Sequence, residues 1–350
     1  MNKITPENWI HGMSLEMKAE QVPNIGVVGC GFVGSAVRNG FSPNVGCDAT
    51  VRVYDKDPNK ATHTLEETVN KSDFLFVSVP TPANPDGTMN SDILFECINE
   101  INDICTNENL IILIRSTVVP GTTEKIQNYC PNLKVVFNPE FLTERSANYD
   151  FINQSRFIIG GRSGDDISVK EVEDLYRWRF GKTVSIVCTD YQSAEMVKYM
   201  TNTFFATKIS FLNDMYLLCD AVNANWEDVM EGFVRDGRVG HTHLGVPGHD
   251  GKFGFGGSCF PKDIQAVITF AEEAGIDMAV LKGAWATNLK VRPEKDWEKL
   301  EGRATVKQEE TLGLQNSRPE GDGTEYITGI EEDGRVYRRA MGTKQKEYIT

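Results

Sequence analysis

The stretch N-I-G-V-V-G-C-G-F-V-G at residues 24–34 constrains the fold most strongly. A short apolar run precedes three glycines in the order G-x-G-x-x-G, namely Gly29, Gly31 and Gly34, and an apolar helical pattern follows them. That context of strand, turn and helix is what the glycine pattern requires to hold the diphosphate of a dinucleotide. A tight turn between a strand and a helix, with no ligand, is the alternative interpretation.

A second apolar run, V-R-V-Y-D at residues 51–55, ends in an acid that fits the same interpretation. Asp55 lies 21 positions after Gly34, near the distance at which an acid binds the ribose hydroxyls and selects NAD. Asp57 is the second candidate for this role.

Further apolar runs alternate with helical patterns along the first half of the chain. We expect strands within residues 72–80, 110–117, 134–142, 155–161 and 184–188. Continuous apolar strands that alternate with helices are typical of α/β proteins with a parallel, doubly wound, Rossmann-like sheet. Ligands bind at the carboxyl ends of such strands, where the sequence places Thr81, Thr117 and the segment N-P-E-F-L-T-E.

From residue 190 the pattern becomes helical. Residues 194–222 contain neither proline nor glycine, and Lys198 and Asn202 are four apart, hence on one helix face. Further helices are expected at about 223–235, 264–274 and 278–289. The apolar residues of the long helix exceed one narrow stripe, which favours a homodimer built on it.

The polar C-terminal region offers little for a further core. The segment from Glu325 to Ala340 fits one hairpin about Asp333–Gly334, within a loosely attached or disordered tail. We therefore expect four parts: an N-terminal extension (1–22), an NAD-binding Rossmann-like domain (23–189), a central helical and dimerisation domain (190–300) and a polar tail (301–350).

The chemistry concentrates at G-F-G-G-S-C-F-P-K-D, residues 254–263. Pro261 suits a first helical turn, so Cys259 is expected near a helix N-terminus with Lys262 close by. Both features lower a thiol pKa toward the reactive thiolate. A small buried hydrophobic cysteine is the alternative.

Charge and cysteine usage exclude several classes of protein. The formal charge of −14 argues against a nucleic-acid surface and against anionic membranes. Apolar runs fall short of the roughly 20 residues that span a bilayer, and an export signal is not evident. Eight scattered cysteines without a C-x-x-C pair fit neither zinc nor a disulfide scaffold, so we expect no metal and a cytoplasmic location.

Six separate motifs in order between residues 24 and 292 carry a family resemblance. They are G-C-G-F-V-G, S-V-P-T-P, S-T-V-V-P-G-T, N-P-E-F-L-T-E, K-Y-M-T-N and F-G-F-G-G-S-C-F-P-K-D. Together they resemble the UDP-glucose/GDP-mannose dehydrogenase family. The resemblance implies an NAD-dependent four-electron oxidation of a nucleotide sugar, with conversion of UDP-glucose to UDP-glucuronate as the first expectation.

The resemblance also implies roles for individual residues. Cys259 matches the nucleophile that forms a thiohemiacetal and then a thioester, and Lys198 with Asn202 matches the oxyanion pair. Asp263 with Thr117 would hold a water, Glu140 would act as acid and base, and Glu144 would be its companion. Cofactor contacts fall on Gly29, Gly31, Phe32, Val33, Gly34, Asp55, Thr81, Thr117 and Glu144. Substrate contacts fall on Phe141, Leu142, Lys198, Asn202, Arg238, Phe253, Gly254, Phe255, Gly256, Gly257 and Lys262.

Two departures from the family pattern bear on the substrate. The segment between Arg238 and Cys259 is longer than in typical UDP-glucose enzymes. Family members carry a third, nucleotide-binding domain, whereas this chain has a polar tail at that place, so substrate affinity is expected to be weak unless something replaces the domain. Two alternatives remain: a two-electron β-hydroxyacid dehydrogenase, for which Cys259 has no use, and a non-catalytic NAD-binding remnant.

Overall fold

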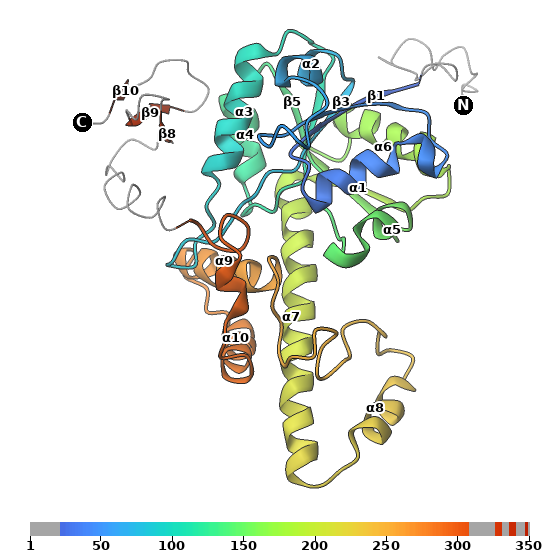
Figure 1. Cartoon of the computed structure of the whole chain (residues 1–350), viewed down its shortest axis with the longest axis vertical. Helices are drawn as coiled ribbons and strands as arrows, with labels where there is room; N and C mark the ends of the chain where they lie inside the picture. Colours follow the sequence, from blue (N-terminus) through green and yellow to red (C-terminus); the bar gives the residue numbers. More distant parts are fainter. Residues whose placement is uncertain (1–21, 308–325, 331–335, 341–346, 349–350) are drawn as a thin grey trace, which may run out of the picture.

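The computed structural model describes residues 22–307, 326–330, 336–340 and 347–348. It consists of an α/β domain and a group of helices, which the long helix α7 joins (Figure 1). The expected N-terminal extension lies outside the described residues except for Val22.

The α/β domain contains a seven-stranded sheet in the order β2-β1-β3-β4-β5-β6-β7. Its strands are β1 (Asn24–Val28), β2 (Thr50–Tyr54), β3 (Phe74–Val77), β4 (Ile111–Ile114), β5 (Lys134–Phe137), β6 (Phe157–Gly161) and β7 (Ile186–Asp190). The chain passes from β1 to β2 on one side and then to β3 on the other. The carboxyl ends of β1 and β3 therefore flank the crevice in which open α/β sheets bind their ligands.

One step in the sheet differs from the wholly parallel arrangement that the sequence predicts. Strand β6 pairs antiparallel with β5 through Phe137 and Gly160, and β7 then runs parallel to β6. Between β5 and β6 the chain forms only the short helices η3 (Glu144–Ser146) and α5 (Ala147–Ile152). Helix α5 lies against α1, with Phe151 on Phe41. A parallel strand normally needs a long crossover helix before it. Here η3 and α5 take the place of that helix, and β6 runs antiparallel to β5.

Helices cover both faces of the sheet, as a doubly wound fold requires. One face packs against α1 (Phe32–Gly40), α5 and α6 (Ile167–Phe180). The other packs against α2 (Leu65–Asn70), α3 (Asp92–Ile104) and α4 (Thr122–Tyr129). Neighbouring residues of β4 alternate between the two cores, with Leu113 in one and Ile112 in the other. The expected fold class is confirmed.

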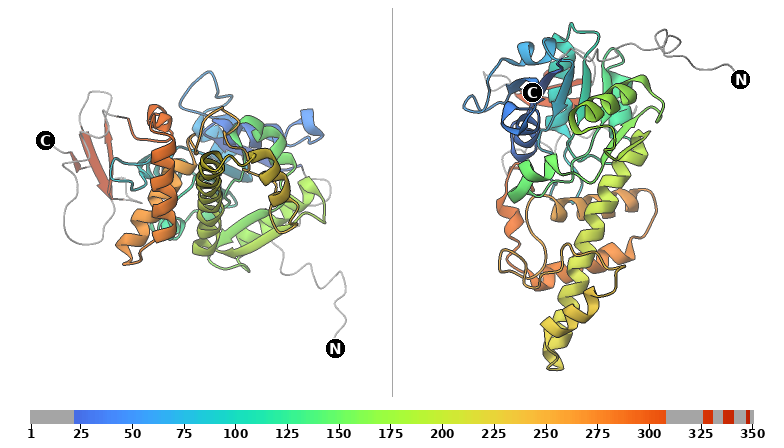
Figure 2. Two further views of the ribbon diagram at one scale, coloured as in Figure 1. Left: turned by 90° about the horizontal axis from the view of Figure 1, so that it is seen from below. Right: turned by 90° about the vertical axis from the view of Figure 1, so that its right-hand side faces the viewer.

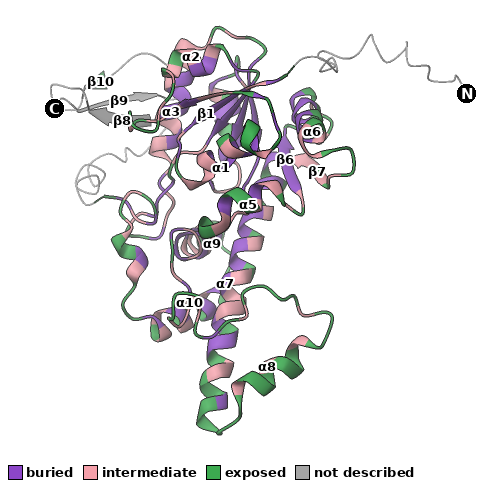
Figure 3. Ribbon diagram, turned by 45° about the vertical axis from the view of Figure 1, so that its right-hand side comes forward, coloured by how far each residue is buried: buried purple, intermediate pink, exposed green. Residues whose placement is uncertain are grey.

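The long helix α7 (Tyr191–Ala221) starts at the sheet and extends to the far end of the molecule (Figures 1 and 2). The Asp190 carboxylate caps its first turn by accepting a hydrogen bond from Ser193 N at 2.8 Å. Helices α9 (Phe260–Glu273) and α10 (Ala279–Val291) pack beside α7, whereas α8 (Trp226–Val234) lies near its far end. Figure 3 shows that exposure increases toward that end. The helices expected from the sequence are confirmed.

After α10 the chain returns to the α/β domain. It passes through η4 (Asp296–Lys299) and bonds Ala83, which donates to Ala304 O at 2.9 Å and accepts from Val306 N at 3.0 Å. Ala304 and Val306 are buried, so the first residues of the expected tail are packed rather than loose.

Beyond this return the structure confirms the strands of the expected hairpin. Strand β8 (Tyr326–Ile330) pairs antiparallel with β9 (Val336–Ala340), and β10 (Glu347–Tyr348) joins β9. The turn between β8 and β9 lies outside the described residues. In the described part of the chain, helices lack an apolar stretch long enough to cross a bilayer.

Candidate active site

The glycine motif forms the turn between β1 and α1 and has the shape that a dinucleotide needs. Gly29 has a φ of 84°, and a Cβ there would lie 2.6 Å from Ser78 O. A Cβ on Gly34 would overlap the Gly29 carbonyl oxygen. At Gly31, the residue before α1, a Cβ would point into open space. The first and third glycines are thus required by packing, and the second leaves the helix N-terminus open to a diphosphate.

Asp55 follows β2 beside this turn. Its carboxylate accepts hydrogen bonds from Cys30 N at 2.6 Å and Asp57 N at 2.8 Å. Asp57 instead accepts from Asn59 N at 3.0 Å within its own turn. Asp55 is therefore the acid attached to the glycine turn, and the residues present fit a dinucleotide with its adenosine ribose at β2. Phe32 and Val33, in the first turn of α1, are partly buried beside it.

The loops after β3 and β4 are joined to each other. The Thr81 hydroxyl donates to Thr117 O at 2.8 Å, and the Ser116 hydroxyl donates to Val79 O at 2.6 Å. Thr81 and Thr117 are both buried. Both residues lie in the loops after the carboxyl ends of β3 and β4, at the edge of the sheet where the sequence predicts them.

Cys259 lies at the N-terminus of α9, where the sequence predicts it. It is the residue before the first helical turn, which contains Pro261, and its carbonyl accepts a hydrogen bond from Asp263 N at 2.9 Å. The side chains of Cys259 and Asp263 are thus one helical turn apart at the start of α9.

Lys198 on α7 and Glu140 after β5 form a buried ion pair. Lys198 Nζ lies 2.8 Å from Glu140 Oε1 and 2.6 Å from Glu140 O, and both side chains are less than a tenth exposed. Burial raises the pKa of the Glu140 carboxyl, but Lys198 and a hydrogen bond from Leu142 N outweigh it and hold that pKa below its usual value. Burial lowers the pKa of Lys198, and Glu140, Cys259 and Asp263 more than compensate. Both groups are therefore charged near neutral pH.

A second buried pair joins α7 to α9. Asn202 Nδ2 donates to Asp263 Oδ2 at 2.6 Å, and Lys262 Nζ lies 2.5 Å from Asp263 Oδ1. All three side chains are buried. With Lys198 and Glu140, this group contains two cations and two carboxylates, so its charges balance, as buried charges require.

The expected low pKa of the Cys259 thiol is wrong for this structure. Burial is the largest effect and raises that pKa, and Glu140 and Asp263 raise it further. Lys198 and Lys262 act in the opposite direction and do not outweigh these effects. The sequence indicates the cationic neighbours but not the two buried carboxylates, so Cys259 is a thiol at neutral pH in this state.

Some expected site residues lie apart from this cluster. Glu144 is exposed and pairs with Arg303 at 2.7 Å, and the backbone between it and Glu140 is not helical. A spacing of four therefore does not place Glu144 beside Glu140. The Arg238 side chain is highly exposed and pairs with Asp236.

Of the other expected substrate contacts, Phe141 and Leu142 flank the Lys198–Glu140 pair. Lys198 Nζ is 5.5 Å from the centre of the Phe141 ring. The Phe255 side chain is buried among helices, 6.1 Å from the Trp285 ring centre, so its backbone is the part that can meet a ligand. Among the residues from 22 to 307, the structure contains no cluster of three or more His, Cys, Asp or Glu suited to a metal ion.

Two family models match the chain, and both matches contribute residues to the cluster. The NAD-binding domain of the UDP-glucose/GDP-mannose dehydrogenase family matches residues 46–179, and the central domain of that family matches residues 192–290.

The chain belongs to this family.

Its α/β domain is accordingly an NAD-binding domain. A UDP-glucose 6-dehydrogenase from Rickettsia conorii is 34% identical over 255 residues, which are 71% of this chain and 56% of the relative. One from Bacillus subtilis is 32% identical over 72% of this chain and 57% of its own length. The chain thus spans little more than half the length of these curated relatives.

Solved structures agree with the family assignment. A UDP-glucose dehydrogenase from the archaeon Pyrobaculum islandicum superposes with a TM-score of 0.67 at 28% identity, over 78% of this chain and 69% of that one. A 3-hydroxyisobutyrate dehydrogenase from Mycobacterium tuberculosis gives a TM-score of 0.63 at 15% identity, over 85% of this chain and all of that one. The second likeness shows a shared fold alone.

Sequence reasoning missed several buried polar residues in this member of the family. The Arg115 side chain, at the end of β4, donates to Asn138 Oδ1 at 2.5 Å and lies 5.7 Å from the Phe151 ring centre. Glu195 accepts hydrogen bonds from Gly121 N at 2.6 Å and Thr123 N at 2.9 Å. An arginine that ends an apolar strand, and an acid one turn before Lys198, were the available signals.

Proposed function

We propose that this chain oxidises the C6 alcohol of a nucleotide sugar, with UDP-glucose as the first candidate, to a carboxylate at the expense of two NAD. The observation that carries the proposal is the position of Cys259 beside the buried pair of Lys198 and Glu140. Asp263, one helical turn after Cys259, accepts a hydrogen bond from Asn202, which lies one turn after Lys198 on α7. The mutual effects of Cys259, Lys198 and Glu140 on their pKa values also support a potential nucleophile near a cation and a base.

The reaction consists of two oxidations and a hydrolysis. NAD held at the glycine turn would supply the hydride acceptor for each oxidation. After the alcohol has lost a hydride and a proton, Cys259 Sγ adds to the aldehyde carbon and gives up its own proton, which forms a thiohemiacetal. Loss of the second hydride and the hydroxyl proton gives a thioester. Water then cleaves the carbon–sulfur bond, releases the carboxylate and restores the thiol.

The neighbouring residues supply the charges and proton acceptors for these steps. Lys198 has three N–H donors, and two of them bond Glu140, which leaves one for an oxyanion on the sugar. The Asn202 side-chain amide has two N–H donors, and one of them bonds Asp263, which leaves the other for the same oxyanion. Fixed donors in a buried site stabilise developing negative charge effectively. Glu140 is ionised and suits the role of proton acceptor.

The β-hydroxyacid alternative shares the fold but does not use a thiol. Counting NADH formed per sugar separates the proposals. Two NADH per UDP-glucose support the four-electron reaction, one per hydroxyacid supports the alternative, and bound NAD without turnover supports a non-catalytic protein.

Replacing Cys259 by alanine tests the covalent step directly. The Cys259→Ala variant is expected to bind NAD normally and to form no uronate, because the aldehyde then has no sulfur to make it tetrahedral. NAD titration by fluorescence and chromatography of the products measure the two effects. A normal yield of carboxylate from this variant contradicts the proposed mechanism.

We also propose a homodimer formed through α7. One side of this helix and its C-cap expose Met200, Phe204, Phe211, Leu218 and Val222, each 52 to 73% exposed. Their spacing of four or seven residues places them along a single stripe, as at a helix–helix interface. An exposed apolar stripe of this kind favours association with another protein surface, and light scattering tests whether that surface is a second copy.

A further inference from the structure

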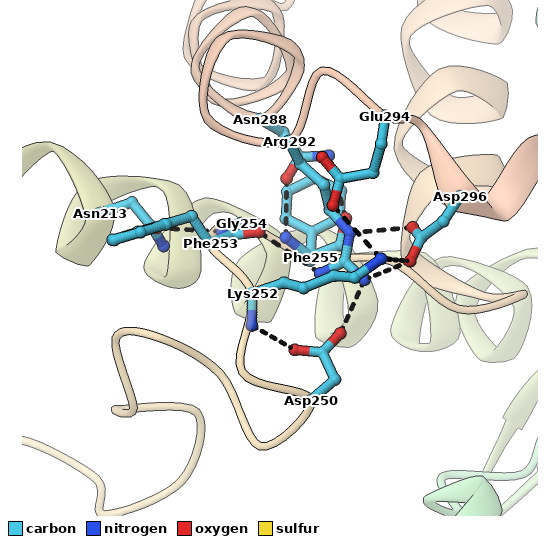
Figure 4. Close-up of polar contacts among 10 residues, drawn as sticks. All are labelled: Asn213, Asp250, Lys252, Phe253, Gly254, Phe255, Asn288, Arg292, Glu294 and Asp296. Atoms are coloured by element: carbon cyan, nitrogen blue, oxygen red, sulfur yellow. Dashed lines mark hydrogen bonds and ion pairs between the residues drawn. The ribbon is translucent and has the colours of Figure 1, made fainter.

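The glycine-rich segment from Phe253 to Gly257, called here the substrate loop, precedes Cys259 by two residues. Figure 4 shows side chains from two helices around it. Asn213 belongs to α7, and Asn288 and Arg292 lie four positions apart on α10 and directly after it. None of these three residues has a role in the proposed function above.

Asn288 binds the backbone of the substrate loop at both polar atoms of its amide. Its Oδ1 accepts from Phe255 N at 2.7 Å, and its Nδ2 donates to Phe255 O at 3.0 Å. Asn213 Oδ1 accepts from Gly254 N at 3.0 Å. Asn213 and Asn288 are fully buried, so the loss of either leaves unpaired backbone groups away from water, which is costly.

Arg292 binds the first residue of the substrate loop and two carboxylates that lie outside the loop. Its guanidinium donates to Phe253 O at 3.3 Å, to Asp250 at 2.7 Å and to both carboxylate oxygens of Asp296 at 2.7 and 2.9 Å (Figure 4). The side chain is only 3% exposed. Planar, bidentate contacts of this kind are specific to arginine.

Asn288 and Arg292, with the carboxylates and Lys252 around Arg292, are called here the clamp. Two glycines of the substrate loop are required by its close contact. A Cβ on Gly254 would overlap Asn288 Oδ1, and a Cβ on Gly256 would lie 2.6 Å from Arg292 Nη2. Gly257 differs, because a Cβ there would meet open space. Gly254 and Gly256 thus allow the close contacts with Asn288 and Arg292, whereas Gly257 allows the backbone turn, since its φ is 76°.

The clamp itself is not suited to bind an anionic ligand. Arg292 and Lys252 are paired with Asp250, Glu294 and Asp296, so two cations face three carboxylates. A diphosphate brought to this group would meet a net negative charge.

We propose that Asn288 and Arg292 are positioning residues, which hold the substrate loop in the conformation that binds the sugar nucleotide and presents Cys259 to it. The inference rests on the proposed function, because it assigns the loop to the substrate. A displaced loop moves the reacting atoms, and a misplacement of about 1 Å costs on the order of 100-fold in rate.

The test compares Arg292→Ala with Lys290→Ala, which removes an exposed cation two residues earlier, in the last turn of α10. We expect Arg292→Ala to lower kcat/KM for UDP-glucose about 100-fold, with a lower kcat because Cys259 is misplaced and a higher KM because the loop binds the substrate less well. NAD affinity should stay within about twofold. Hydrogen exchange at the Phe255 amide should become faster. Lys290→Ala should change none of these quantities. Arg292→Lys, which keeps the charge without the bidentate geometry, should lie between them and serves if the alanine variant does not fold.

A double-mutant cycle sharpens the test. Gly256→Ala in the wild type forces a methyl group into the guanidinium, whereas in Arg292→Ala that space is free. The loss in kcat/KM from Gly256→Ala should therefore be smaller in the Arg292→Ala background. Equal losses in both backgrounds overturn the proposed contact.

The outcomes also separate this inference from the proposed function. Wild-type turnover with unchanged KM and unchanged Phe255 exchange in Arg292→Ala overturns the positioning role and leaves the proposed function intact. A wild-type chain that neither binds nor oxidises a nucleotide sugar overturns the proposed function, and the positioning role with it.

Discussion

Two faces of α7 invert the usual relation between polarity and burial. The face against the rest of the protein contains Glu195, Lys198, Asn202 and Asn213, all buried. The stripe on its other side, from Met200 to Val222, is apolar and exposed. In most globular helices the apolar side is inside.

The difference between the two faces lies in whether their side chains have partners within the described chain. The buried polar groups are satisfied by Glu140, Asp263, the α4 N-terminus and the substrate loop, so burial leaves none of them unpaired. The apolar stripe has no such partner within the described chain. The first face is therefore complete in one chain, and the second becomes complete in the proposed dimer.

The largest expected effect is a loss of kcat when Lys198, on the buried face, is replaced. Lys198→Met leaves Glu140 without its cation and removes a donor to the oxyanion, so kcat should fall by about 10² to 10³-fold. NAD affinity should change little, because the glycine turn is unaffected. Steady-state kinetics and NAD titration measure both.

Lys170→Met is the matched control for Lys198→Met. Lys170 forms an exposed ion pair with Asp165 at 3.6 Å, and such pairs contribute little. If Lys198→Met turns over as fast as Lys170→Met, Lys198 does not take part in catalysis.

An intermediate effect is expected on the pH dependence of stability, through the titration of Glu195. Burial raises the pKa of this carboxyl to about 7, although Thr123 and Gly121 donate to it. Because the pKa is higher in the folded than in the unfolded state, its contribution to stability is complete below about pH 4.5 and is lost as pH rises through 7. The loss is on the order of 3 kcal/mol.

Glu195→Gln should therefore flatten the dependence of the unfolding temperature on pH between pH 5 and 8. Thermal unfolding of both proteins across that range measures the slopes. Parallel slopes contradict the assignment of the titration to Glu195.

The smallest expected effect concerns the exposed face. Phe211→Ser removes one apolar contact from the stripe and should weaken self-association about tenfold, which corresponds to about 1.4 kcal/mol. Light scattering over a dilution series measures it, with Asp220→Asn, an exposed polar change on the same helix, as the control. A wild-type protein that is monomeric at all concentrations excludes the interface.

Local patterns predicted the fold well. The glycine turn, Asp55 and the helical spacing of Lys198 and Asn202 each depend on residues close in sequence, and each lies where the pattern indicates. The antiparallel step at β6 was not predictable in this way, because it depends on how α5 packs against α1.

The sequence motifs predicted which residues form the candidate site, but not how these residues affect one another. Cys259, Lys198, Asn202, Asp263 and Glu140 form one cluster, yet the effect of the carboxylates on the thiol required their distances in space. Sequence reasoning missed Asn213 and Asn288, because a buried asparagine that binds a distant backbone resembles any helical asparagine. Asn213 lies eleven residues after Asn202, three helical turns further on the same face, and that spacing was a usable signal.

The return of the chain to Ala83 has a mechanical consequence. The helical domain is connected to the sheet both at the start of α7 and at the hydrogen bonds of Ala83 with Ala304 and Val306. The ion pairs of Lys198 with Glu140 and of Arg303 with Glu144 add further contacts between the same two parts. A movement that separates the helical domain from the sheet must therefore break the bonds at Ala83 as well as these ion pairs.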